Sequence, residues 1–99
     1  MGKFILQITY DVKPELRDQY LALAKEMQSH FAGERKKAYS VFEQKGKKNS
    51  FVEQFVCMNA EDFERLEDDM DETSEGLVNR LEALLKDGSA RYSTLVEME

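Results

Sequence analysis

The first segment of the chain alternates between apolar and polar positions, which is the pattern of a half-buried β-strand. Over residues 3–12, one face carries an apolar side chain at every second position: Phe4, Leu6, Ile8, Tyr10 and Val12. The other face mixes Ile5 with Gln7 and Thr9. Pro14 lacks an amide hydrogen and fits the first turn of a helix, so the strand is expected to end before it.

Beyond Pro14 the apolar spacing lengthens to three and four residues, which predicts an amphipathic helix. Its apolar stripe consists of Leu16, Tyr20, Leu23, Met27 and Phe31, and Gly33 is expected to end it. Residues 38–45 and 50–58 are rich in aromatic and β-branched side chains and flank a polar turn at 46–49. This pair of segments predicts a β-hairpin.

The rest of the chain predicts two helical pieces and a last strand. Asn59 can cap a helix whose apolar positions are Phe63, Leu66, Met70, Leu77, Leu81 and Leu84. Residues 67–76 are poor in apolar side chains, so we expect a break there, with Thr73 or Ser74 capping the second piece. Gly88 is expected to end this helix, and residues 90–98 alternate again as a strand.

The order β-α-β-β-α-β predicts an α+β, ferredoxin-like fold: a four-stranded antiparallel sheet with helices on one face. A length of 99 residues allows one domain, which we expect to cover residues 1–99. The strand at 50–58 is apolar on both faces, and we place Phe55 on the face without helices. Such a face needs a cover, so we expect a homodimer, a bound ligand, or both.

Composition narrows the range of functions. A net charge of −6 disfavours nucleic-acid binding, and residues 48–55 lack the glycines and aromatic spacing of an RNA-recognition motif. No apolar run approaches the length of a membrane span, so we expect a cytoplasmic protein. A single cysteine and a single histidine make a transition-metal site improbable.

The chain resembles the dimeric α+β barrel superfamily, and in particular antibiotic biosynthesis monooxygenase-like domains. The resemblance covers nearly the whole length. It is carried by the opening strand FILQITYDVKPE, by the strand FVEQFV with a helix starting soon after it at 59–63, and by the closing strand YSTLVEME after a long broken helix. It implies that two sheets pack face to face across a two-fold axis, with each subunit's helices outside. A small cavity is implied either between sheet and helices or inside the barrel.

Members of this superfamily include cofactor-independent oxygenases of polycyclic aromatic compounds and haem-degrading enzymes. By resemblance, they rely on an asparagine in the first strand, a tryptophan near the end of the third and a histidine on a helix. Gln7 stands near the asparagine position and Cys57 near the tryptophan position. Because the second helical region has no histidine, we do not expect haem degradation.

Gln7, His30 and Glu53 are the candidate catalytic residues. Glu53 interrupts an apolar strand face between Phe51 and Phe55, and a dry, unpaired carboxyl there would have a raised pKa. The alternative is that Glu53 pairs with a lysine or arginine of a neighbouring strand or of a partner chain. His30 is the one side chain that normally titrates near neutral pH, and its alternative is a structural role at a helix end.

Ligand contacts are expected from Thr9, Phe51, Phe55 and Cys57. The alternative for Cys57 is that it is a small side chain of the core and not a reactive thiol, because nothing near it in the sequence lowers the pKa of its thiol. We therefore expect a dimer that binds a small apolar or aromatic molecule, with no cofactor, metal, nucleic acid or membrane. As an enzyme it would be a cofactor-independent monooxygenase; the alternative is a non-catalytic, stress-associated binding module of the same fold.

Overall fold

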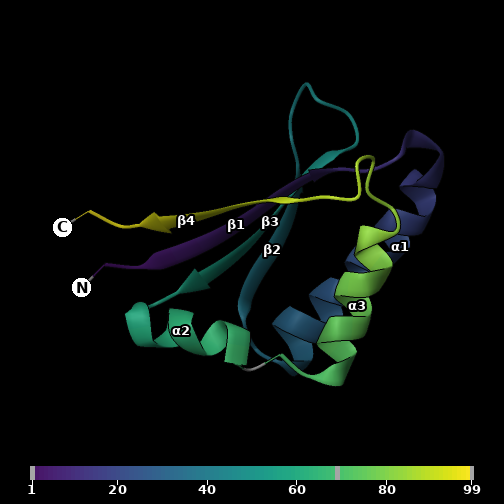
Figure 1. Cartoon of the computed structure of the whole chain (residues 1–99). Coiled ribbons are helices and arrows are strands. Elements are labelled where there is room, and N and C mark those ends of the chain that lie inside the picture. The colour runs from purple at the N-terminus through teal and green to yellow at the C-terminus, as the bar shows by residue number, and fades with distance from the viewer. Residues whose placement is uncertain (1, 69, 99) are drawn as a thin grey trace.

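The protein folds into one four-stranded antiparallel sheet with its helices on one face (Figure 1). The computed structural model describes residues 2–68 and 70–98, except for the side chain of residue 67. The strands are β1 (Phe4–Asp11), β2 (Ala38–Glu43), β3 (Ser50–Cys57) and β4 (Arg91–Val96), in the order β2-β3-β1-β4. This arrangement confirms the predicted α+β, ferredoxin-like fold.

The helical elements lie in two groups. The short 3-10 turn η1 (Pro14–Leu16), helix α1 (Arg17–Gln28) and the π-helical segment η2 (Ser29–Glu34) follow β1. Helices α2 (Ala60–Asp68) and α3 (Glu72–Glu82) follow β3, and Figure 1 shows α3 beside α1 while α2 lies apart, near the chain ends. None of these helices has the length and apolar character needed to cross a bilayer.

The strand register decides which side chains meet the helices. Tyr10 pairs with Phe51, Ile8 with Glu53 and Leu6 with Phe55, so the even positions of β1 and the odd positions of β3 share one face. The buried core lies between this face and the helices, where Tyr20, Leu23 and Met27 of α1 meet it. Our placement of Phe55 on the helix-free face is therefore wrong. Both faces of β3 are apolar, so its sequence alone does not say which face meets the helices.

The end of the first helix also differs from expectation. Gly33 does not stop the helix, because a wide turn carries it to Glu34, with the Arg35 amide donating to the His30 carbonyl at 2.8 Å. The chain reverses at Lys36, whose φ of 53° lies in the left-handed region. This wide turn places His30 and Phe31 inside the fold.

The predicted break in the second helical region is confirmed, but its cap is different. Asn59 caps α2 through the Asp62 amide at 2.8 Å, as expected. Asp71 caps α3, its carboxylate accepting from the Ser74 amide at 2.8 Å, so neither Thr73 nor Ser74 is the cap. Helix α3 ends at Glu82, before Gly88, because the following backbone pairs with the segment after β1.

Removing the Asp71 carboxylate should destabilise the protein. Asp71→Ala leaves an amide of the first turn of α3 without its acceptor, so the midpoint of thermal unfolding should fall by several degrees. Thr73→Ala is the matched control, because Thr73 is exposed within the same turn and should leave the midpoint nearly unchanged. Thermal unfolding followed by circular dichroism checks both variants, and an equal loss in the two would contradict the assignment of the cap.

Candidate functional site

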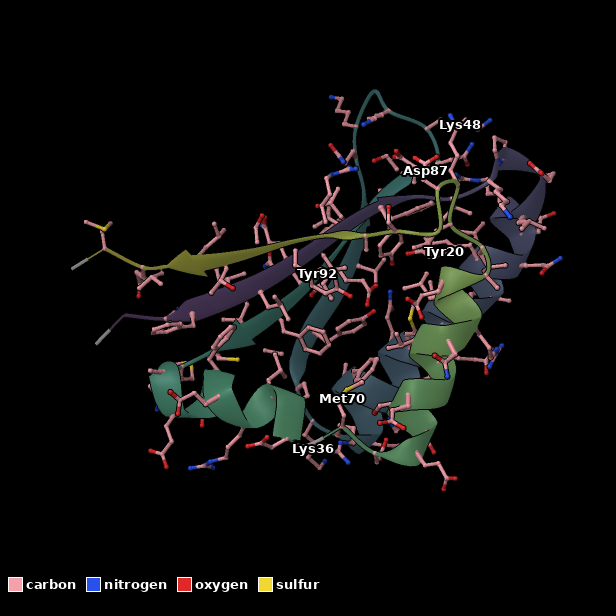
Figure 2. The ribbon with its side chains drawn as sticks, in the orientation of Figure 1. Tyr20, Lys36, Lys48, Met70, Asp87 and Tyr92 are labelled. Atoms are coloured by element: carbon pink, nitrogen blue, oxygen red, sulfur yellow. The ribbon has the colours of Figure 1, made fainter. Side chains whose placement is uncertain are left out.

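A cavity of about 560 Å³ lies between the helix-facing side of the sheet and helices α2 and α3. Its walls are mainly apolar, with Leu6, Ile8 and Phe55 from the sheet and Phe63 and Leu66 from α2. Tyr92 of β4 and Met70 of the α2–α3 junction also line it, and both are labelled in Figure 2. The break between the two helices therefore shapes the cavity as well as the fold.

Glu53 brings a carboxyl group to the wall of this apolar cavity. It lies in the middle of β3, between Ile8 of β1 and Val41 of β2, and 3% of its surface is exposed to solvent. The Tyr39 hydroxyl donates to its Oε1 at 2.6 Å. Its Oε2 is buried and has no hydrogen-bond partner, and no ion pair to Glu53 is formed within the described part of the chain.

Burial raises the pKa of Glu53, because an ionised carboxylate loses its hydration there. The hydroxyl of Tyr39, which donates to the carboxyl group, and the nearby hydroxyl of Tyr10 offset part of this rise. Burial also raises the pKa values of Tyr10 and Tyr39, and the charge that Glu53 would carry adds to both shifts. The surroundings therefore favour an uncharged cluster of one carboxylic acid and its phenols.

Tyr20 extends this cluster to α1. Its hydroxyl lies 2.8 Å from that of Tyr10, and its ring packs on Phe51 with centroids 4.2 Å apart. The spacing of apolar positions placed Tyr20 in an apolar helix stripe and Tyr10 on an apolar strand face, where a tyrosine looks like any other core residue. A tyrosine at a position expected to be buried could have indicated this cluster, because the hydroxyl of a buried tyrosine needs a hydrogen-bond partner.

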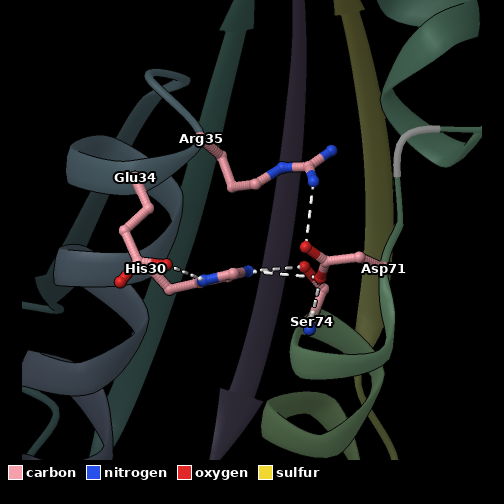
Figure 3. A network of polar contacts seen from close by, with 5 residues as sticks. All are labelled: His30, Glu34, Arg35, Asp71 and Ser74. Carbon is pink, nitrogen blue, oxygen red and sulfur yellow. Dashed lines mark hydrogen bonds and ion pairs between the residues drawn. The ribbon is translucent and has the colours of Figure 1, made fainter.

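His30 belongs to a second polar cluster, shown in Figure 3. Its Nε2 lies 2.8 Å from the Ser74 Oγ and 3.3 Å from an Asp71 oxygen, and its Nδ1 lies 3.2 Å from Glu34. Arg35 donates to Asp71 at 2.9 Å. Hydrogen bonds from Ser74 lower the pKa of Asp71, and the charges of Arg35 and His30 add to this effect. The cluster ties η2 to the start of α3, beside the cavity that Ser74 also lines.

The sheet separates the candidate catalytic residues. Gln7 and Thr9 project from the helix-free face, where the Gln7 amide donates to Gln54 at 3.3 Å. Glu53 and His30 lie on the helix side, in different hydrogen-bonded clusters. Gln7 is therefore not brought together with Glu53 in a single chain.

The expected ligand-contact residues are also divided. Phe55 lines the cavity, whereas Phe51 packs against Tyr20 in the core. Cys57 is buried near the end of β3, and burial raises the pKa of its thiol, with Asp62 adding to the rise. The described residues hold no cluster of three or more side chains suited to a metal ion.

A second hollow, about 450 Å³ in volume, runs along the loop between β2 and β3. It is lined by Arg17 of α1 and by charged and polar loop residues. The guanidinium of Arg17 forms a bidentate ion pair with the carboxylate of Glu43, with N–O distances of 2.6 and 2.9 Å. This ion pair lowers the pKa of Glu43 to about 2. The arrangement attaches the loop to the helix and brings no buried reactive group to the hollow.

No protein-family model matches the chain, and no curated protein matches its sequence. Solved structures do match. A conserved protein from Methanosarcina mazei has a TM-score of 0.83 at 12% identity, covering 99% of this chain and 95% of that one. A Deinococcus radiodurans protein provisionally assigned as an antibiotic biosynthesis monooxygenase has a TM-score of 0.77 at 13% identity, covering 97% and 93%.

A third structure, named antibiotic biosynthesis monooxygenase, has a TM-score of 0.70 at 21% identity and covers 100% of this chain and 98% of its own. At such low identities the likeness establishes the fold alone. The chain shares the α+β, ferredoxin-like fold of these structures, which is the fold that its order of strands and helices predicted.

Replacing Glu53 with glutamine should change how stability depends on pH. The raised pKa of Glu53 means that its contribution to stability is complete below its unfolded pKa of about 4.3. That contribution declines as the pH rises through the folded-state pKa. Glu53→Gln cannot lose a proton, so at pH 7 it should be as stable as the parent or more stable. Denaturant unfolding from pH 4 to pH 8 measures the difference, and a less stable glutamine variant at pH 7 would mean an ionised, paired carboxylate.

The Tyr39 hydroxyl offers a matched test of the same cluster. Tyr39→Phe keeps the ring but leaves the buried Oε1 of Glu53 without its donor, so it should cost about 1–3 kcal/mol of unfolding free energy. Tyr92→Phe is the control, because the Tyr92 side chain is largely exposed. Equal stability of the two phenylalanine variants would show that the Tyr39 hydrogen bond does not support the cluster.

Proposed function

We propose that the protein binds a small, largely apolar or aromatic molecule in the cavity between its sheet and helices α2 and α3. The observation that carries this proposal is the combination of apolar walls with a buried carboxyl group that has an unpartnered oxygen. Natural ligand sites combine a large apolar surface with a few polar groups that orient the ligand. Buried polar atoms are normally paired, so an unpaired one beside a cavity supports a binding role.

The reaction we propose for this site is cofactor-independent monooxygenation. The support is the fold shared with a structure named antibiotic biosynthesis monooxygenase, together with a titratable group at the cavity wall. Without a cofactor, the substrate must supply all the electrons: a methylene carbon becomes a carbonyl, one oxygen atom enters the product and the other leaves as water (CH₂ + O₂ → C=O + H₂O). Glu53 would exchange the proton that this change requires.

A non-catalytic binding module is the alternative. The observation in its favour is that Gln7 lies on the other side of the sheet from Glu53, while His30 is engaged with Ser74, Asp71 and Glu34. A catalytic site needs several polar groups directed at one reacting centre. In a single chain, Glu53 is the one candidate catalytic residue at the cavity wall.

We further propose that the helix-free face of the sheet forms a homodimer. Three rows of side chains cross this face, each contributed by all four strands: Ala38, Val56, Ile5 and Leu95; Ser40, Gln54, Gln7 and Ser93; and Phe42, Val52, Thr9 and Arg91. The first row is apolar, and Phe42 and Leu95 are 51% and 45% exposed. A second copy packed on this face would remove that apolar surface from water.

A cavity-filling substitution tests ligand binding. Val78 lines the cavity from α3, so Val78→Trp should occupy its volume and weaken binding of 2-isopropenylnaphthalene at least tenfold in calorimetric titration. Asn79→Trp is the control, because the neighbouring position is exposed and should leave the affinity unchanged.

Oxygen uptake with 1,3-dihydroxynaphthalene, measured in the same variants, tests the oxygenase. Binding without uptake would favour the non-catalytic module.

Light scattering tests the homodimer. The parent protein should have about twice the mass of its 11.5 kDa chain, and this mass should depend little on salt because Arg91 is the one charged side chain in the three rows. Val56→Asp places a charge in the apolar row and should give a folded monomer, whereas Asn79→Asp on the exposed side of α3 should stay dimeric. A monomeric parent protein at micromolar concentration would contradict the dimer.

A further inference from the structure

Helix α2 is packed less tightly than the other helices. Helices α1 and α3 bury apolar side chains in the core, among them Leu23 of α1 and Leu77 of α3. Among the described side chains of α2 none is buried, and its two large apolar residues, Phe63 and Leu66, are only half-buried. A segment with few buried apolar contacts opens at a smaller free-energy cost than the whole fold. Opening of α2 therefore does not require the core to unfold.

The inner side of α2 faces the cavity and not a filled core. Phe63 and Leu66 line the cavity. The ring of Phe63 also packs at a tilt against the ring of Phe4, beside it on β1, with centroids 5.5 Å apart. The ion pair between Arg65 and Glu61, at 2.6 Å, joins two exposed residues of the same helix and does not attach α2 to the sheet. Moving α2 away from the sheet would therefore break the contact between Phe4 and Phe63.

The start of α3, in contrast, is held from the other side. Asp71 caps α3 through the Ser74 amide, and the Arg35 guanidinium donates to the same carboxylate at 2.9 Å. The ring of His30 lies 2.8 Å from the Ser74 Oγ (Figure 3). Arg35 and His30 both belong to the segment that follows α1, so these contacts attach α3 to the first helical group. Helix α2 can then move while α3 keeps its place.

The inner wall of the cavity is covered in this structure. Glu53 is 3% exposed and its Oε2 is buried, so a ligand reaches this carboxyl group only after a covering element has moved. We propose that α2 is a lid, which swings away from Phe4 about the exposed residues Met58 and Met70 at its two ends and so admits the ligand. This proposal rests on the proposed binding function and adds the way in which the site opens. Closure of such a lid shields the bound molecule from water.

Native-state hydrogen exchange tests whether α2 opens by itself. After correction for intrinsic rates, the amides in the second half of α2 should exchange about a hundredfold faster than those of Leu77 and Leu81 in α3, because the latter belong to the buried core. Addition of 2-isopropenylnaphthalene should slow the exchange in α2, since the bound molecule favours the closed lid. Equal rates in α2 and α3 would show that the two helices open together, which would overturn the lid.

A covalent tether tests the lid during binding. In a Cys57→Ser background, Phe4→Cys and Phe63→Cys supply two thiols, which a short bis-maleimide joins across the contact that the lid must break. Stopped-flow measurement of naphthalene fluorescence should show that this tether slows both association and dissociation of 2-isopropenylnaphthalene by about tenfold or more. The matched control is the same variant with each thiol capped by N-ethylmaleimide, which adds similar bulk without the link.

A second tether tests which helix moves. Glu26 of α1 and Arg80 of α3 form an exposed ion pair at 2.6 Å, so Glu26→Cys and Arg80→Cys place two thiols across the contact between these helices. In the same Cys57→Ser background, this tether should leave both rate constants unchanged, because α3 stays in place. A second tether that slows binding as much as the first would contradict the assignment of the motion to α2.

These outcomes separate failure of the lid from failure of the proposed function. If 2-isopropenylnaphthalene does not bind the parent protein, the binding function fails and the lid fails with it. If it binds, and the tethered and capped variants have equal rate constants, the binding function stands and the lid fails.

Discussion

The structure is organised around the burial of one carboxyl group. Glu53 occupies a central strand position that is 3% exposed, where an ionised carboxylate would lose its hydration without gaining a counter-ion. The protein accommodates the group by favouring its neutral form and by placing phenols around it. Tyr39 comes from β2, Tyr10 from β1 and Tyr20 from α1, so the cluster links three elements that are distant in sequence. Changes to the carboxyl should therefore affect both the stability of the fold and the chemistry of the cavity.

The cavity beside Glu53 depends on the second helical region being broken. A continuous helix could not follow both the chain ends, where α2 lies, and the flank of α1, where α3 lies (Figure 1). Asp71 supports the break by capping α3 and by pairing with Arg35, and His30 joins the same cluster. Ser74 belongs to this cluster and to the cavity wall, so the His30 cluster has a structural role that also shapes the site.

Much of this fold could be predicted from the pattern of apolar positions. A period of two predicted the four strands, a period of three to four predicted the helices, and the shortage of apolar side chains at 67–76 predicted the break between α2 and α3. The face of Phe55 could not be predicted, because β3 is apolar on both sides and only its pairing with β1 decides the matter. The π-helical end of the first helix has no sequence signal, and Asp71, Thr73 and Ser74 are competing caps at the start of α3.

The site was predictable only in part. Glu53 was identified because a carboxyl group breaks an apolar pattern, which is a local property of the sequence. Its tyrosine partners were missed because a tyrosine in an apolar stripe looks like any other large core residue. Gln7 was grouped with Glu53 by resemblance to known proteins, but alternation along β1 directs Gln7 to the opposite face from Ile8, the partner of Glu53.

The protonation state of Glu53 tests the central claim most directly. Carbon-13 NMR of the glutamate side-chain carboxyl groups, assigned by comparison with Glu53→Gln, follows each group through a pH titration. The account predicts that Glu53 stays protonated at a pH where ordinary exposed glutamates are already ionised. A Glu53 signal that titrates together with the exposed glutamates would contradict it.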